Sequence, residues 1–263
     1  MKRIFSILCM ACAVLGAQAS DFCRKNADGK IIYYNITTQK GGKPTVSVTF
    51  FQEGDAFTYK DTLNVPETVT RKEVTYTVTA VGRRAFYYSN SLQVVNLPKT
   101  VTKIEDEAFK MSTVQAVNGT QNVETVGLEA FYSTQVKSIE LPALKKLGKM
   151  AFFECDLKHF DIGSSIERIE EGTFNFSKEY RVKLPATLKY VGKKVFDAQR
   201  MADVYCFGTV PPKCEPNSFC EKLSDLRSLV LHVPAGARSA YENASVWQDF
   251  GTIVEFTPAT MKE

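Results

Sequence analysis

The side chains best suited to covalent chemistry in this 263-residue chain are its cysteines and histidines. Cys155 and His159 form a close cysteine–histidine pair, and such a pair can act as nucleophile and base. Cys155 occupies a small apolar slot in a repeated pattern, so we predict that it packs in the core. The sequence contains no His-Glu-x-x-His, Gly-x-Ser-x-Gly or phosphate-loop motif. We therefore predict that the protein is not an enzyme and uses no cofactor.

A second group of cysteines lies near the C-terminus. Cys206, Cys214 and Cys220, together with His232, supply the ligand types that zinc prefers, but their spacing lacks Cys-x-x-Cys pairs. We predict no metal site. One disulfide among the three cysteines would suit an oxidising compartment, and the sequence does not select the pair. With Cys23 and the core cysteine, five cysteines follow residue 19, so at least one thiol is free or pairs with another chain.

A six-residue frame, Val/Ile/Leu-Gly-x-x-Ala-Phe, recurs along most of the chain. Its phenylalanines lie 21 to 23 residues apart, a period that is typical of a solenoid. We expect each frame to form one short helical turn that points Ala-Phe inward. Glu105 and Glu170 replace the glycine, so the second frame position does not require a left-handed backbone. One repeat cannot bury its apolar face alone, so the phenylalanines should stack in one column. The column consists of Phe86, Phe109, Phe131, Phe152, Phe174, Phe196 and Phe219.

A short strand follows each frame and usually closes with Leu-Pro, which ends the strand at a corner. Stacked strands predict a parallel sheet along one face, and alternation turns every second side chain outward. This outward face is the predicted binding surface, although a merely solvated sheet would show the same pattern. Its mixed polarity suits a protein or a glycan better than a nucleic acid. The predicted face comprises Asn96, Asn118, Glu140, Asp161, Lys183 and Tyr205, with Ser138, His159 and Arg181 beside them.

The N-terminus has the pattern of an export signal. Lys2 and Arg3 precede an apolar run, and Ala17-Gln18-Ala19 forms a small-x-small cleavage site. The run is too short to span a bilayer, and no other run is long enough, so we predict no transmembrane helix in the mature chain. Processing as a lipoprotein at Cys12 is the alternative. The protein is expected outside the cytoplasm, either secreted or at the cell surface or periplasm.

The chain divides into four parts on these signals. Residues 1–19 form the signal peptide, and residues 20–79 a β-rich N-terminal cap with a divergent first repeat. Residues 80–234 hold the repeats, and residues 235–263, which include Trp247, form a C-terminal cap. A formal net charge of +4 is too small to argue for nucleic-acid binding.

The frame, followed by an apolar strand and Leu-Pro, resembles the BspA-type leucine-rich repeat of Bacteroidetes surface proteins. The stretch from Leu231-His232-Val233-Pro234 through Trp247 to Ile253-Val254-Glu255 resembles the closing unit of such proteins. The resemblance implies a right-handed leucine-rich-repeat solenoid of α/β repeats. It also implies an exported or surface protein, some members being adhesins that bind host proteins. The family shares no catalytic residues.

Two functions from different classes remain open on the sequence. The first is an exported, non-catalytic binding protein for cell-surface adhesion, or for interaction with a host extracellular protein, a glycan or an envelope protein. The alternative is a structural or assembly component of the bacterial cell envelope without a soluble ligand. An enzyme with an unrecognised site is a third reading, which nothing in the motifs favours.

Overall fold

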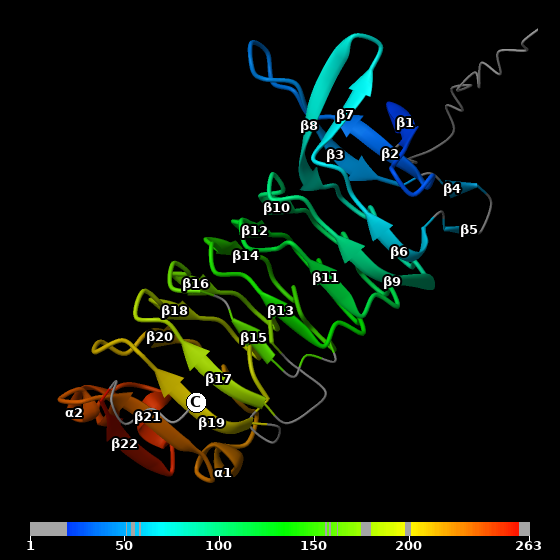
Figure 1. Ribbon diagram of the computed structural model, residues 1–263. Coiled ribbons are helices and arrows are strands. Elements are labelled where there is room, and N and C mark those ends of the chain that lie inside the picture. The colour runs from blue at the N-terminus through cyan, green and yellow to red at the C-terminus, as the bar shows by residue number, and fades with distance from the viewer. Residues whose placement is uncertain are drawn as a thin grey trace, which may run out of the picture.

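The computed structural model describes residues 20–50, 52–53, 56–57, 59–155, 157, 159–161, 163–174, 180–197 and 201–257. The chain forms an elongated stack of coils, with a β-sheet cap at its N-terminal end and short helices at its C-terminal end (Figure 1). The predicted export signal, residues 1–19, lies outside the described residues.

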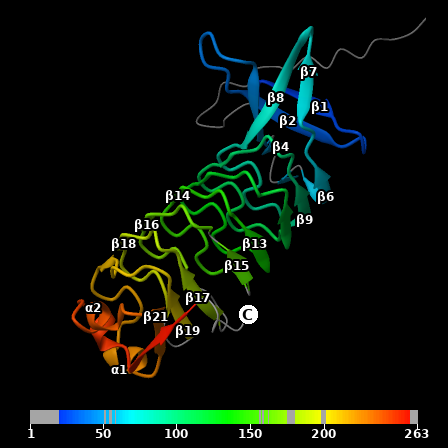
Figure 2. The same ribbon diagram turned by 60° about the vertical axis from the view of Figure 1, so that its left-hand side comes forward.

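Each coil contributes strands to two parallel ladders, which lie on different sides of the stack (Figures 1 and 2). The sequence predicted one of them, which we call the long-strand ladder. Hydrogen-bonded pairing runs from β6 to β11, from β13 to β15 and from β17 to β22. Its strands are β6 (Lys60–Asn64), β9 (Ser91–Asn96), β11 (Ala116–Asn118), β13 (Ser138–Glu140), β15 (His159–Asp161), β17 (Tyr180–Leu184), β19 (Met201–Cys206), β21 (Val230–Pro234) and β22 (Thr252–Phe256).

The second ladder, the short-strand ladder, was not predicted. Each of its strands has two residues, and the second of them is the apolar first residue of a frame in all but the last strand. That residue is buried, whereas its neighbour is turned outward. The strands are β10 (Lys103–Ile104), β12 (Thr125–Val126), β14 (Lys146–Leu147), β16 (Arg168–Ile169), β18 (Tyr190–Val191) and β20 (Lys213–Cys214).

The remainder of each frame is a series of overlapping turns, so the predicted helical turn is wrong. In the first copy, the Ala85 N–H donates to a carbonyl three residues earlier at 3.1 Å. The N–H groups of Arg84 and Phe86 donate instead to the carbonyls of Asp106 and Ala108 in the next coil, at 3.1 and 2.7 Å. A helix would keep all of these bonds within one coil. N–H groups that donate within the coil thus alternate with N–H groups that donate to the next coil, so the turns themselves join neighbouring coils.

The fourth frame position adopts a left-handed backbone in every copy, with φ between 51° and 67°. The glycines of the second frame position avoid that region, as Glu105 and Glu170 indicated. A left-handed backbone costs about 1–2 kcal/mol for a residue with a side chain, so the cross-coil hydrogen bonds must hold it in place. One of the seven residues is a glycine. They are Arg84, Glu107, Glu129, Met150, Gly172, Lys194 and Asn217.

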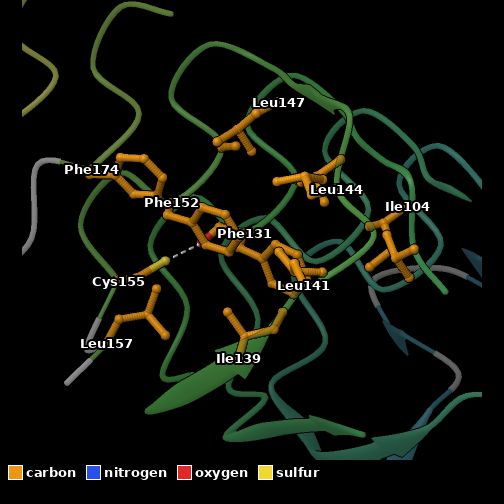
Figure 3. Close-up of a cluster of buried hydrophobic side chains, with 14 of the residues drawn as sticks. Ile104, Phe131, Ile139, Leu141, Leu144, Leu147, Phe152, Cys155, Leu157 and Phe174 are labelled. Atoms are coloured by element: carbon orange, nitrogen blue, oxygen red, sulfur yellow. Dashed lines mark hydrogen bonds between the residues drawn. The ribbon is translucent and has the colours of Figure 1, made fainter. Parts of the chain in front are cut away.

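The seven frame phenylalanines form one continuous stack. Successive ring centroids lie 4.8 to 5.9 Å apart, the interplanar angles are 7° to 26°, and no ring is more than 2% exposed. Figure 3 shows Phe131, Phe152 and Phe174 side by side in the core. A ring in edge-on contact closes each end of the stack: Tyr59 lies 5.2 Å from Phe86 at an interplanar angle of 62°, and Trp247 lies 5.2 Å from Phe219 at 68°. The edge-on geometry suits aromatic pairs and ends the series.

The N-terminal cap continues the short-strand ladder as one sheet. Its first three strands are antiparallel, and the third pairs in parallel with β8, which pairs in turn with β10. A further strand, β7, forms a hairpin with β8, and β4 and β5 pair apart from this sheet. The strands are β1 (Phe22–Lys25), β2 (Ile31–Ile36), β3 (Thr45–Thr49), β4 (Gln52–Glu53), β5 (Ala56–Phe57), β7 (Thr68–Arg71) and β8 (Val74–Val81).

The turn between β1 and β2 covers the first strand of the long-strand ladder. The Lys30 ammonium donates to the carbonyls of Thr62 and Lys60 at 2.6 and 3.2 Å. The Asn26 side-chain amide donates to the Asn64 carbonyl at 2.9 Å. These side chains satisfy carbonyls that an edge strand would leave unpaired, and so they oppose pairing with another chain.

The C-terminal cap contains α1 (Leu223–Leu226), α2 (Arg238–Glu242) and a 3-10 turn, η2 (Trp247–Asp249). Two fully buried aromatic side chains attach it to the last coils. Trp247 Nε1 donates to the Pro212 carbonyl at 2.7 Å, and the Tyr241 hydroxyl donates to the Gly208 carbonyl at 2.9 Å. The cap therefore both covers the final phenylalanine and satisfies its own polar atoms.

A buried carboxylate joins the first two coils at the turns. The Glu107 side chain is 9% exposed and accepts hydrogen bonds from Arg84 at 2.8 Å and Arg83 at 3.4 Å. Burial disfavours the charged carboxylate, but the Arg84 hydrogen bond and charge outweigh it, so the pKa of Glu107 lies below its usual value. The folded chain thus binds the proton of Glu107 less readily than the unfolded chain.

Glu107→Gln is expected to lower the free energy of unfolding by about 1–3 kcal/mol at neutral pH, because it removes a charged hydrogen-bond acceptor. A depressed pKa stabilises the fold above the ordinary glutamate value of about 4.3, and this contribution is lost as the pH falls through the folded pKa. Urea unfolding at pH 7 and pH 3 should therefore show a difference from wild type that shrinks in acid. Glu124→Gln, at a more exposed ion pair with Lys145, is the control. An equal difference at both pH values would contradict this account.

Candidate functional site

The outward side of the long-strand ladder holds the predicted binding residues. Along its strands, Val95, Val117 and Ile139 point into the core and are at most 5% exposed. The residues that flank them point outward, because side chains alternate along a strand. Asn118 and Glu140 are exposed on this face. The face is therefore a row of polar positions over an apolar core.

Strand register brings the predicted residues together in neighbouring coils. Asn96 pairs with Asn118, and Lys183 pairs with Tyr205. In the middle of the ladder, Ser138 lies opposite His159, and Glu140 lies opposite Asp161.

For His159, Asp161 and Arg181 the side chains lie outside the described part of the structure, so only their strand positions are known. Arg181 falls at a register irregularity between Tyr180 and Val182.

A chain of side-chain amides runs along the N-terminal part of this face. Asn118 Nδ2 donates to Asn96 Oδ1 at 2.8 Å, and Asn96 Nδ2 donates to Asn64 Oδ1 at 2.5 Å. Asn64 Nδ2 in turn donates to Asp28 Oδ2 at 2.7 Å. All donors point toward the N-terminal cap, so the chain of hydrogen bonds has one direction and ends on a carboxylate.

Two members of this amide chain, Asn64 and Asp28, were missed in the sequence. A signal for Asn64 was present, because Leu63-Asn64-Val65-Pro66 has the same order of residue types as Val95-Asn96-Leu97-Pro98. The strand that presents Asn64 is β6, which ends at Asn64, two residues before Pro66. No local signal identifies Asp28, which reaches the face from the turn between β1 and β2.

The C-terminal end of the face is aromatic. The Tyr205 and His232 rings stack at 4.1 Å with an interplanar angle of 3°, and Phe256 lies 6.0 Å from Tyr205. His232 Nε2 lies 3.4 Å from Asp203 Oδ1. The face thus changes from neutral amides through charged residues to aromatic rings along its length.

None of the described cysteines is joined to another by a disulfide. Cys155 is fully buried, and its thiol donates to the Phe131 carbonyl at 2.7 Å (Figure 3), so its predicted place in the core is confirmed. Burial raises the pKa of Cys206 well above its usual value and that of Cys214 to about 12. High thiol pKa values disfavour the reactive thiolate. Cys23 and Cys220 are partly buried and also free, so the disulfide that the sequence left open does not form in this structure.

Within the described ranges, no three histidine, cysteine, aspartate or glutamate side chains gather as a metal site would require. In the same residues, no helix has the length and apolar character needed to cross a membrane.

A stack of coils of about 22 residues, each with a parallel strand, a series of turns and an inward phenylalanine, defines a leucine-rich-repeat solenoid. The chain belongs to the BspA-type leucine-rich repeat family, whose model matches residues 67–179 and 112–223 with six copies. The resemblance predicted from the repeated frame is therefore confirmed. So is the predicted solenoid with a parallel sheet face and a β-rich N-terminal cap.

Searches of known proteins add three solved structures, and no curated protein matches. A leucine-rich repeat protein from Bacteroides ovatus is 17% identical, over 86% of this chain and 75% of its own, with a TM-score of 0.41. The pneumococcal vaccine antigen PcpA is 14% identical, over 90% and 99%, with a TM-score of 0.40. A leucine-rich cell surface protein from Faecalibacterium prausnitzii is 13% identical, over 92% and 97%, with a TM-score of 0.24. Similarity at this level carries no information about function.

Proposed function

We propose that the chain is an exported, non-catalytic binding protein that presents the long-strand ladder to a host extracellular protein or a glycan. The observation that supports this proposal best is the set of polar side chains held in strand register on the outward face. Stacked repeats generate such extended faces, and solenoid proteins use them for binding. The proposed location is the cell surface or the surrounding medium.

The side chains of the outward face favour a partner whose surface combines charged, polar and apolar groups. Exposed Glu140 lies toward the middle of the ladder, and exposed Lys183 lies two coils further along. A nucleic acid would require a continuous basic track to neutralise its phosphates. Charges of both signs with neutral amides and aromatic rings suit a protein or carbohydrate surface better.

Export is proposed from the pattern of residues 1–19. The five thiols of the remaining chain are compatible with this location, because all of them are buried or partly buried, and burial raises the pKa values of Cys206, Cys214 and Cys220.

The proposal predicts that single substitutions on the face weaken capture of a partner, whereas matched substitutions on the short-strand ladder do not. Residues 20–263 would be immobilised and exposed to extracellular matrix and to bacterial envelope extract. The face variants are Asn118→Arg, Glu140→Arg and Lys183→Glu, one for each chemical region. The controls are Lys146→Glu and Lys213→Glu, which are exposed on the short-strand ladder.

We expect at least one face variant to lose a partner that wild type and both controls retain. A partner retained equally by all variants would place binding elsewhere and contradict the proposal. If wild type retains nothing from either source, the proposed binding function fails, and the structural role in the envelope becomes the better explanation.

A further inference from the structure

The N-terminal part of the outward face differs from the rest because it is rich in uncharged amides. We call this surface the amide strip. Asn64, Gln93, Gln115 and Asn118 are exposed and Asn96 is half-buried. The strip draws on β6, β9 and the coil that contains β11, and all five of its side chains are uncharged. It consists of Asn64, Gln93, Asn96, Gln115 and Asn118.

The three asparagines are held in a fixed orientation. Asn96 and Asn118 each use one N–H to reach the preceding coil, and the carbonyls of Asn64 and Asn96 each accept one such bond. A primary amide carries two N–H donors and two acceptor lone pairs. Asn96, at the centre, therefore keeps one donor and one lone pair beyond the amide chain. The same donor and acceptor recur along the solenoid axis at about 4.8 Å, the spacing of neighbouring strands.

The first amide is anchored, which makes the chain rigid. Asn64 Nδ2 donates to Asp28, which also accepts a hydrogen bond from Asn26 Nδ2 at 3.2 Å. The same Asn26 amide binds the Asn64 carbonyl at 2.9 Å. Because these side chains are already held in place, a ligand does not have to immobilise them. Less binding free energy is therefore lost to the entropy cost of ordering side chains.

The amide chain ends at Asn118, where an acceptor is left for a hydrogen-bond donor of a ligand. Asn118 donates to Asn96, which leaves its own Oδ1 as an acceptor, and the next coil places the Glu140 carboxylate at the following outward position. The two coils are in contact, since Thr120 donates to the Glu140 carbonyl at 2.6 Å. Two neighbouring acceptors are satisfied by a hydroxyl group of a ligand better than by each other.

Small apolar residues lie beside the amides. Val94 pairs in register with Ala116, and both are half-buried on the outward side. The strip offers evenly spaced, uncharged amide donors and acceptors beside small apolar side chains, with a carboxylate at each end, Asp28 and Glu140. Such a surface matches the hydroxyl-rich, uncharged and partly apolar surface of a sugar chain. The strand spacing is also comparable with the length of one sugar unit in an extended chain.

We propose that the amide strip binds a neutral polysaccharide through a linear backbone that lies along the solenoid axis, with one backbone sugar unit over each coil. This inference rests on the proposed binding function of the outward face and narrows its N-terminal part to one ligand class. A protein partner on the charged and aromatic part of the face is a separate possibility that the test distinguishes.

Affinity electrophoresis and titration calorimetry with hydroxyethylcellulose, xyloglucan and galactomannan test the proposal, with heparin as the charged comparison. We expect wild type to bind at least one neutral polymer and not to prefer heparin. Asn96→Ala/Asn118→Ala should weaken binding about tenfold or more, since it removes the amide contacts of two coils. Gln121→Ala/Gln248→Ala, which removes two exposed amides outside both ladders, should bind as wild type does.

The asparagine variant also breaks the amide chain, so its melting temperature must be measured. If it unfolds, Gln93→Ala/Gln115→Ala provides the test, because neither glutamine side chain donates or accepts in the amide chain. Neutral-polymer binding that survives in both strip variants would overturn the inference. So would a wild type that captures a matrix protein but no neutral polymer, although the proposed binding function would then stand. Capture of neither would contradict both.

Discussion

Replacing Phe131 by alanine is expected to lower the free energy of unfolding by about 3–5 kcal/mol, as large-to-small changes of fully buried aromatic residues do. The Phe131 ring is 0% exposed and lies between Phe109 at 4.9 Å and Phe152 at 5.1 Å. Its loss would open a cavity in the middle of the stack and remove contacts with both neighbouring coils. Because each coil depends on its neighbours, the cost should appear in the whole array.

Urea unfolding followed by circular dichroism measures this effect. Leu128→Ala is the matched control, because Leu128 lies in the same coil but is 41% exposed. The control should change the free energy of unfolding by less than about 0.5 kcal/mol. A Phe131→Ala protein as stable as this control would show that the ring stack does not hold the coils together.

Replacing Trp247 by alanine is expected to cost a similar amount, about 3–5 kcal/mol, but with a different distribution along the chain. Trp247 closes the stack against Phe219 at 5.2 Å and also packs on Tyr241 at 5.4 Å. Its removal would also leave the buried Pro212 carbonyl without its hydrogen-bond donor. The last coils should open first, since terminal caps protect the end of a repeat array.

Hydrogen exchange shows whether the coils next to the C-terminal cap open first in Trp247→Ala. Amides of β19 and β21 should exchange faster than in wild type, whereas those of β9 and β11 should change little. Val210→Ala is the control, because Val210 is 76% exposed and lies near the same cap. A uniform increase along the array, or none, would show that this cap does not protect the C-terminal coils.

The architecture could be predicted from the sequence because the same pattern of residues recurs in each coil. A phenylalanine every 21 to 23 residues, with an apolar strand between successive copies, has few solutions other than a stack of coils. The alternation in Val95-Asn96 and Ile139-Glu140 likewise predicted which side chains point outward. These features depend on period alone, which a single sequence displays directly.

The frame itself was misinterpreted because its structure depends on the neighbouring coil. A stretch such as Arg83-Arg84-Ala85-Phe86 has no strong turn former, and its residues have ordinary helix propensity. The left-handed backbone at Arg84 is compensated by hydrogen bonds to the next coil, which no local signal reports. The two-residue strands were missed for the same reason, since periodicity cannot identify strands that short.

The candidate site could be predicted in part. Repeat alignment placed Asn96 and Asn118 on neighbouring strands of one face. The hydrogen bonds between them and the continuation to Asp28 depend on how the N-terminal cap folds over β6. Tertiary contacts between segments so far apart in sequence cannot be read from one chain.

The central claim is that the outward face of the long-strand ladder is where this protein binds its partner. The most direct measurement compares the partner retained by Asn118→Arg, Glu140→Arg and Lys183→Glu with that retained by Lys146→Glu and Lys213→Glu. We predict that at least one face variant retains less than about a tenth of the partner, because one lost charged or bidentate contact can cost that factor. The controls should match wild type. Equal retention by all five variants would contradict the claim.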